Sequence, residues 1–206
     1  MSAAVIEAMK AAVGKLDGTG DLPGAGARRA AVAVLLRGGS MGELEVLLMR
    51  RAIREGDRWS GQIGLPGGHE EDFDASLEST ARRESLEEVG VDPGGSGGQL
   101  IGQLPSVQAR ARGERLDLFI TPFVFHHLTP SSPSLGPEAS EAFWLPLAPA
   151  ISGAFDEPYR YQHGEVIHRL PSWRFEGRTI WGMTHGIVNR FGRAMHQHSP
   201  LGSDPI

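Results

Sequence analysis

The sequence contains no cysteine, so neither a disulfide bond nor a thiolate zinc site can form. Long hydrophobic runs are missing as well, and runs such as residues 30–36 are far too short to span a bilayer. The first residues do not show a basic segment followed by an apolar stretch and a cleavage site. We therefore expect a cytoplasmic protein without a membrane partner.

An excess of basic charge is also missing. The 20 Lys and Arg residues are outnumbered by 25 Asp and Glu, which gives a formal net charge of -5 at pH 7. This sign disfavours nucleic acid as the main partner, although a local basic patch can still meet phosphates. With 40% hydrophobic and 22% charged residues, the 206-residue chain suits a soluble domain with a sizeable core.

Hydrophobic periodicity indicates several strands and few helices. Apolar residues recur at helical spacing in residues 3–16, and a Gly/Pro linker follows over residues 19–27. Alternation and Val/Leu content predict strands, and we expect two more helices late in the chain, the first with a Pro near its start. The expected strands are residues 30–36, 43–50, 99–104, 116–125, 141–145, 165–170 and 173–181, and the expected helices are residues 146–152 and 184–197.

These elements predict an α/β protein with three segments. They are an N-terminal helix with its linker (residues 1–27), a main domain (28–197) and a C-terminal tail (198–206). Two interpretations of the N-terminal helix stand: it can cover the sheet, or it can form part of a homodimer contact.

The strongest chemical signal lies in residues 67–91, GGHEEDFDASLESTARRESLEEVGV. Glu84, Glu87 and Glu88 fall within an arc of about 100° on a helix, because positions i, i+3 and i+4 are neighbours. Like charges at this spacing repel unless a hard divalent cation with oxygen ligands binds among them. The pattern predicts a magnesium site. A solvated acidic face, in which Arg83 pairs with Glu87, is the ordinary alternative.

This run closely resembles the Nudix box, G-x5-E-x7-R-E-U-x-E-E-x-G-U, where U is an aliphatic residue. The residues that match at the box spacing are Arg83, Glu84, Glu87, Glu88, Gly90 and Val91. Ser85 stands where an aliphatic residue is usual, and Gly68 lies fifteen residues before Arg83 instead of fourteen. Asp74 is the acid nearest to the first Glu of the box, but an Asp just before a helix is also a good N-cap.

Two further stretches are similar to the coenzyme A pyrophosphatase branch of the Nudix hydrolases. They are LLMRRAIREGDRWSGQIGLPGG before the box and SWRFEGRTIWGMTHGIVNRF near the end. The first is one residue longer than the branch pattern between Arg51 and Gly61, and Trp59 and Leu65 replace a usual His and Phe. The resemblance covers residues from about 30 to 192 and implies the Nudix α/β/α sandwich with a mixed central sheet.

The resemblance implies an activity as well. It is that of a Mg²⁺- or Mn²⁺-dependent pyrophosphatase acting on a small-molecule nucleotide, with coenzyme A or its derivatives split into 4'-phosphopantetheine and 3',5'-ADP. Two alternatives stay open, because the box does not encode specificity. One is an ADP-ribose or nucleotide-sugar pyrophosphatase, and the other is a catalytically silent nucleotide-binding Nudix module.

Candidate roles follow for the residues around the box. Glu84 and Glu88 are expected as direct metal ligands, with Glu87 as a third ligand or one acting through water. The resemblance adds the carbonyl of Gly68, since a glycine lets the backbone come close. Arg83 is expected to orient a glutamate without touching the substrate.

The general base is expected from the box helix or from a remote loop. Glu138 lies eight residues before Pro146, a spacing similar to the E-V-x-x-x-x-W-x-P segment that supplies a remote acid in this family. Glu141 is the nearby competitor. A plain loop carboxylate is an equally good interpretation of either residue.

Several arginines are candidates for phosphate binding. Arg50 and Arg51 end a predicted strand beside the box and can clamp a phosphate by bidentate contacts, or they are ordinary charges at a strand end. Arg110, Arg112 and Arg115 crowd an expected loop, QARARGER, where a guanidinium can receive the 3'-phosphate that distinguishes coenzyme A from dephospho-CoA. A solvated loop is the alternative.

Two other pairs of residues are less informative. His126 and His127 follow a strong strand and could ligate a metal, but no matching His or Cys pattern accompanies them. We expect Trp173 and Trp181 to be core residues, and stacking on a nucleotide base is the alternative.

Overall fold

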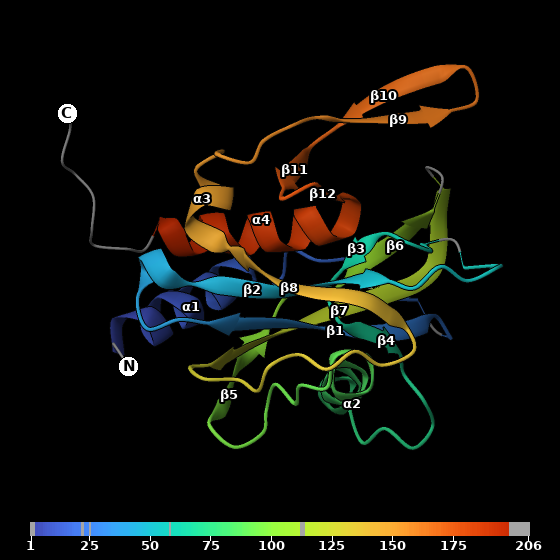
Figure 1. Cartoon of the computed structure of the whole chain (residues 1–206). Helices are drawn as coiled ribbons and strands as arrows, with labels where there is room; N and C mark the ends of the chain where they lie inside the picture. Colours follow the sequence, from blue (N-terminus) through green and yellow to red (C-terminus); the bar gives the residue numbers. More distant parts are fainter. Residues whose placement is uncertain (1–2, 22, 25, 58, 112–113, 198–206) are drawn as a thin grey trace, which may run out of the picture.

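The computed structural model describes residues 3–21, 23–24, 26–57, 59–111 and 114–197. Within them, an eight-stranded mixed sheet forms the centre of the molecule (Figure 1). Its middle strand, β1 (Arg28–Arg37), runs parallel to β7 (Glu114–His127) and antiparallel to both β2 (Glu45–Arg51) and β4 (Gly67–His69). The remaining strands pair outward from β2 and β7 and are β3 (Ile63–Gly64), β8 (Ala139–Pro146), β5 (Gly98–Gln103) and β6 (Val107–Ala111).

Helices cover both faces of this sheet (Figure 1). α2 (Leu77–Val89) packs on one face, and α1 (Ala3–Leu16), α3 (Leu147–Ile151) and α4 (Gly182–His196) pack on the other. The alternation of a strand separates the two cores: Leu35 of β1 faces α2, whereas Val34 faces α1 and α4. The architecture is the expected α/β/α sandwich with a mixed sheet.

The N-terminal helix belongs to the larger of these cores. Val5, Ile6, Met9 and Ala12 of α1 are buried in the same cluster as the sheet and α4. The apolar face of this helix therefore covers the sheet. A short 3-10 turn, η1 (Met41–Glu43), connects β1 to β2. No helix in the described ranges is long and apolar enough to cross a bilayer.

Two small hairpins lie outside the main sheet. β9 (Tyr159–His163) pairs with β10 (Val166–Leu170), and β11 (Ser172–Phe175) pairs with β12 (Arg178–Trp181). The prediction of one strand over residues 173–181 was wrong, because the chain turns at Glu176 and Gly177, both with positive φ. The β9–β10 hairpin projects from the body of the molecule (Figure 1).

The predicted loop between residues 108 and 115 was also wrong. β6 and β7 form an antiparallel ladder that continues to the pair Ala111↔Glu114. Alternation explains this, because Ala109 and Ala111 are buried while Arg110 between them is exposed. Arg112 and the tail at 198–206 lie outside the described residues.

Candidate functional site

The glutamate-rich helix α2 has well-defined ends. Ser76 is its N-cap and forms a reciprocal capping box with Ser79, and Gly90 ends the helix in the left-handed conformation with φ 67°. Ser85, at the position where the box usually has an aliphatic residue, is buried, and its hydroxyl donates to Val91 O at 2.8 Å. The helix therefore keeps a buried polar contact where an apolar one is usual.

The two glycines of β4 allow this helix to come close to the sheet. A Cβ at Gly68 would lie 2.5 Å from Glu84 Oε1, and one at Gly67 would collide with the carbonyl of Ala31. Any side chain at position 68 would displace the Glu84 carboxylate. The glycine pair thus creates the space in which backbone and carboxylates meet.

Glu88 is the most deeply buried of the three box glutamates. Its side chain is 1% exposed, and its Oε2 accepts a hydrogen bond from Gly67 N at 2.9 Å. Its Oε1 has no hydrogen-bond partner among the described residues, although Arg51 Nη1 lies 3.6 Å away. Burial raises the pKa of Glu88 to about 8, against the opposing effects of the Gly67 N–H and of Arg51.

Glu84 and Glu87 occupy different environments. Burial raises the pKa of Glu84, and the hydrogen bond from Arg83 Nη1, at 2.9 Å, opposes this shift. The side chain of Glu87 is 57% exposed and lies 3.1 Å from the same Arg83 nitrogen. Glu84 and Glu88 therefore face the sheet, and Glu87 lies at the solvent edge.

Arg83 is held in place by Asp74. Asp74 accepts two hydrogen bonds from Arg83 and one each from Thr80 Oγ1 and Glu71 N. These contacts, the Arg83 hydrogen bond above all, lower the pKa of Asp74 to about 2. The N-cap interpretation of Asp74 was wrong, because Ser76 caps the helix.

The residues present fit a divalent cation at this position. No group of three or more His, Cys, Asp or Glu side chains in the described ranges is already arranged to hold a metal ion. Even so, Glu88 Oε1 is a buried oxygen without a donor, and the backbone of Gly68 lies against the Glu84 carboxylate. All these groups are oxygen donors, the type that Mg²⁺ and Mn²⁺ prefer.

The two remote acids have separate surroundings. Glu138, just before β8, lines the same cleft as Glu84 and Glu88, and its charge raises the pKa of both. Its Oε1 lies 3.0 Å from Arg54 Nη1. Glu141 instead accepts hydrogen bonds from Arg178 and Arg50, which lower its pKa. Glu138 is therefore the acid that faces the carboxylates of the box.

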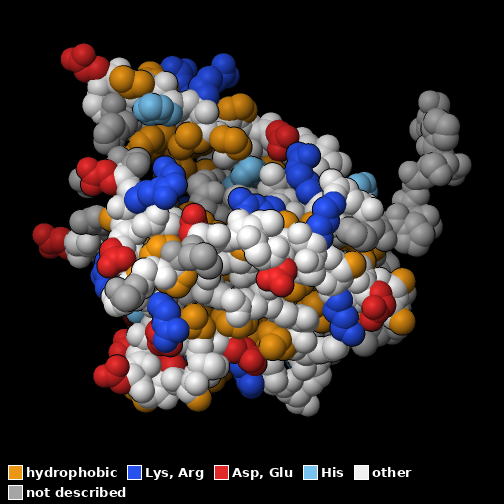
Figure 2. Space-filling model, turned by 180° about the vertical axis from the view of Figure 1, so that it is seen from behind, with side chains coloured by type: hydrophobic (Ala, Val, Ile, Leu, Met, Phe, Trp, Pro, Cys, Tyr) orange, Lys and Arg blue, Asp and Glu red, His pale blue; other side chains and the backbone are white. Residues whose placement is uncertain are grey.

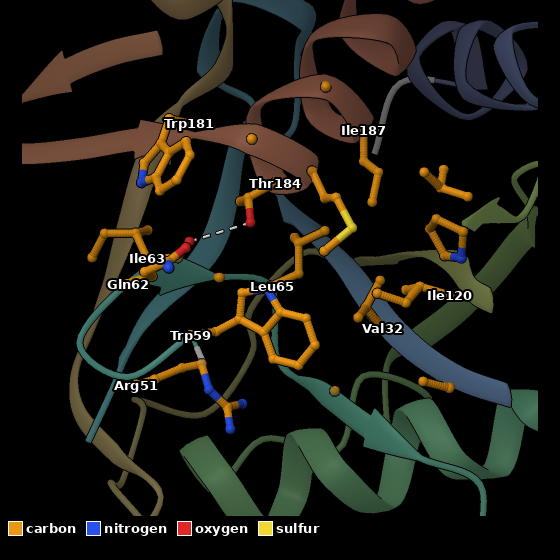
Figure 3. Close-up of a pocket in the computed structure, with 18 of the residues that line it drawn as sticks. Val32, Arg51, Trp59, Gln62, Ile63, Leu65, Ile120, Trp181, Thr184 and Ile187 are labelled. Atoms are coloured by element: carbon orange, nitrogen blue, oxygen red, sulfur yellow. Dashed lines mark hydrogen bonds between the residues drawn. The ribbon is translucent and has the colours of Figure 1, made fainter. Parts of the chain in front are cut away.

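A cleft of about 1710 Å³ runs past these carboxylates. Figure 3 shows Arg51 near α2, Trp59 in the middle of the cleft, the apolar side chains of Val32 and Ile120 on the sheet, and Trp181 at the far end. The start of α4 is tied to the sheet, because Thr184 Oγ1 donates to Ile63 O at 3.2 Å. The cleft thus joins an acidic end to an aromatic end.

The predicted arginines are spread over different surroundings. Arg50 and Arg51 both line the cleft, where Arg50 donates to Glu141 and Arg51 to Asp57. Arg110 lines the cleft as well. Arg115 lies opposite Arg110 in the ladder and points its Nη1 to Gln108 Oε1 at 3.3 Å. Arg112 is outside the described residues.

Sequence reasoning missed several residues of the aromatic end. Trp173 is a core residue, as expected, but Trp181 is half-buried and lines the cleft. Tyr159, Tyr161 and His168 of the β9–β10 hairpin line it too. The spacing of Tyr159 and Tyr161, two residues apart as on one face of a strand, was the available signal. His126 and His127 are buried elsewhere, and His126 Nε2 lies 2.9 Å from Gly38 O.

The sandwich, the carboxylate helix and the glycine strand together define a hydrolase of the Nudix type. The chain belongs to the Nudix family, because the NUDIX domain model matches residues 27–170. It is therefore a Nudix hydrolase, an enzyme of the class that acts on phosphorus-containing anhydrides.

Curated relatives agree with this family. The chain is 34% identical over 146 residues to an uncharacterized Nudix hydrolase, NudL, from Shigella boydii, covering 69% of this chain and 71% of NudL. It is 42% identical over 107 residues to the uncharacterized protein C14C4.10c of Schizosaccharomyces pombe, over 50% of this chain. That match spans only 32% of the yeast protein.

Solved structures share the fold. The MutT/nudix family protein from Enterococcus faecalis superimposes with a TM-score of 0.51 at 20% identity, over 88% of this chain and 68% of that one. The NUDIX hydrolase from Nitrosomonas europaea gives a TM-score of 0.51 at 17% identity, over 84% and 74%. These similarities concern the fold alone.

Proposed function

We propose that the protein is a metal-dependent pyrophosphatase that hydrolyses the pyrophosphate bond of a nucleoside diphosphate derivative. Coenzyme A and its derivatives are the first candidates, with 4'-phosphopantetheine and 3',5'-ADP as products. The single observation that carries this proposal is the buried Glu88 carboxylate, whose Oε1 has no hydrogen-bond donor in the described part of the chain. Ionising a carboxylate that is buried and incompletely hydrogen-bonded is costly, and a divalent cation would offset that cost.

Glu84, Glu88 and the carbonyl of Gly68 are the groups that would hold Mg²⁺ or Mn²⁺. Glu87, at the solvent edge, would act as a third ligand or through water. A bound divalent cation would neutralise charge on the phosphoryl oxygens of the substrate. The raised pKa of Glu88 is a property of the cation-free protein, and coordination favours its ionised form.

The surrounding residues position these carboxylates and the substrate. Arg83, held by Asp74, fixes Glu84 and Glu87, so we assign it the role of orienting these glutamates. Glu138 faces the site from the loop before β8. We therefore assign it the role of general base, which accepts a proton from the attacking water. Glu87 is the alternative base from the box helix.

Arg50 and Arg51 lie at the end of β2, beside the box carboxylates, and both line the cleft. We propose that they bind the phosphates of the substrate, because a planar guanidinium group can donate two parallel hydrogen bonds to phosphate oxygens. Their present partners, Glu141 and Asp57, hold the two side chains at this edge of the cleft. A phosphate would compete with those carboxylates for the same nitrogens.

The cleft has room for coenzyme A, and its lining favours this substrate over a compact sugar nucleotide. Small-molecule sites typically enclose about 300 to 1,000 Å³, whereas this cleft measures about 1710 Å³. Its middle is apolar, with Val32, Leu65, Ile120 and Ile187 on its walls (Figure 3). Such a surface suits the long, weakly polar arm of a pantetheine group.

Mass analysis of products tests this proposal. The protein would be incubated with CoA, dephospho-CoA, ADP-ribose, NADH and a dinucleoside polyphosphate, each with Mg²⁺ or Mn²⁺. We expect 4'-phosphopantetheine and 3',5'-ADP from CoA. Turnover of ADP-ribose without turnover of CoA would favour the ADP-ribose or nucleotide-sugar alternative, and no turnover of any substrate would favour the silent nucleotide-binding module.

A further inference from the structure

The β9–β10 hairpin presents an aromatic face to the cleft. Tyr159 pairs with Leu170 and Tyr161 with His168, so these four side chains lie on one face of the hairpin. All four line the cleft, whereas Ile167, on the opposite face, is exposed. The sequence contains two tyrosines in all, and both are on this face.

Trp181 meets this face from the body of the protein. Its ring centroid lies 4.7 Å from that of Tyr159 and 5.5 Å from that of Tyr161, with tilted planes. All three rings are half-buried, unlike Trp173, which is 1% exposed on the neighbouring strand. Figure 2 shows orange side chains gathered at the projecting hairpin, together with a pale blue His and the blue ends of Lys or Arg side chains.

We propose that Tyr159, Tyr161 and Trp181 form the stacking site for the heterocyclic base of the nucleotide substrate. This inference rests on the proposed function, because it presumes a nucleotide in the cleft. Half-exposed rings offer flat, apolar faces that a base covers without regard to its hydrogen-bonding pattern. His168 lies across the ladder from Tyr161 and adds a polar group beside the base.

The position of the three rings supports this assignment. They lie at the opposite end of the cleft from Arg51 and the box helix α2, as the close-up in Figure 3 shows for Trp181. An extended nucleotide can therefore stack its base on the aromatic end while its pyrophosphate reaches the carboxylates.

A purely structural role makes a different prediction. A two-stranded hairpin is marginally stable alone, so the contact between Trp181 and the tyrosines would then serve to hold the hairpin on the body. In that case loss of Trp181 lowers the melting temperature, and affinity falls equally for ligands with and without a base.

Equilibrium binding of a matched pair of ligands separates the two roles. Adenosine 5'-phosphate and ribose 5-phosphate share the phosphate and the sugar, and they differ by the base. Titration calorimetry of the full chain with Mg²⁺ should give at least about tenfold tighter binding of the adenosine compound. Trp181→Ala should abolish most of this preference, Trp181→Phe should keep most of it, and Ile167→Ala, on the outer face, should keep all of it.

The proposal is overturned if the wild-type protein binds both ligands equally, or if the preference survives both Trp181→Ala and the double variant Tyr159→Leu/Tyr161→Leu. Circular dichroism and melting curves identify a variant that has lost its fold, and Trp181→Leu then replaces it. Since binding needs no turnover, a base preference in a protein that hydrolyses nothing would disprove the proposed pyrophosphatase and leave the stacking site standing.

Discussion

Asp74 binds Arg83 through two parallel contacts. Arg83 Nε lies 3.0 Å from Asp74 Oδ1, and Arg83 Nη2 lies 2.9 Å from Asp74 Oδ2. Both side chains are largely buried, and a third nitrogen of the same guanidinium reaches Glu84 and Glu87. The pair therefore connects the loop before α2 to the carboxylates on it.

This pair predicts a specific dependence of stability on pH. The folded-state pKa of Asp74 is about 2 and the unfolded value is 3.8, so the stabilisation is complete above about pH 5 and is lost as pH falls toward 2. Asp74→Asn should lower the free energy of unfolding at pH 6 by about 2 kcal/mol. Urea denaturation from pH 6 to 3 should show the difference shrinking, with the exposed Asp72→Asn as control. Equal stability of wild type and Asp74→Asn at pH 6 would refute the role of this pair.

The box helix could be predicted from the sequence, but the partner of Arg83 could not. Helical spacing and the box match locate the glutamates of α2 without any structure. Asp74 suited two interpretations equally, because an Asp near a helix start can cap it or serve the site. The structure assigns the cap to Ser76 and turns Asp74 toward a residue nine positions away, which depends on the path of the loop.

The hairpins show a second limit of sequence reasoning. Residues 173–181 alternate as one strand would, and the turn at Glu176 carries no glycine at its first position. Trp173 and Trp181 belong to neighbouring strands of one hairpin, yet Trp173 is buried and Trp181 lines the cleft. Which tryptophan is covered depends on packing against distant elements, so local periodicity gives no signal.

The buried carboxylate of Glu88 predicts a second pH effect, of opposite sign. Burial raises its folded-state pKa to about 8, against 4.5 in the unfolded chain, so the metal-free protein loses stability as pH rises between these values. Glu88→Gln cannot titrate and should escape that loss, on the order of a few kcal/mol between pH 5 and 8. Urea denaturation in a chelator measures both proteins. Parallel pH profiles would contradict the prediction.

Divalent cations should stabilise the native protein. Binding to the folded state at a hundred times Kd contributes about 2.7 kcal/mol, which corresponds to roughly 5 to 10 °C in melting temperature for a chain of this size. The triple variant Glu84→Gln/Glu87→Gln/Glu88→Gln should show no rise in melting temperature with Mg²⁺ or Mn²⁺. Glu78→Gln, at the start of the same helix, is the control and should respond like wild type. An equal rise in the triple variant would place the cation elsewhere.

Arg110 and Arg115 offer a matched test of the 3'-phosphate site. They lie opposite each other in the β6–β7 ladder, but Arg110 lines the cleft and Arg115 contacts Gln108. Arg110→Ala should remove one charge-assisted contact, about 1.5 to 3 kcal/mol, and lower kcat/KM for CoA roughly ten- to a hundredfold. The same variant should hydrolyse dephospho-CoA with unchanged kcat/KM. Arg115→Ala should leave kcat/KM unchanged for both substrates. Equal losses for both substrates in Arg110→Ala would exclude the site.

The turnover of Glu88→Gln tests the central claim most directly. The substitution nearly keeps the side-chain volume, and its amide oxygen can keep the contact to Gly67 N. An amide nitrogen, which does not bind a cation, then replaces the buried oxygen that is assigned to the metal. We predict that kcat falls by at least about a hundredfold on the substrate that the product analysis identifies, with an unchanged circular-dichroism spectrum. Glu87→Gln, at an exposed position, should show a smaller fall in kcat. Near-normal kcat in a correctly folded Glu88→Gln protein would contradict the account.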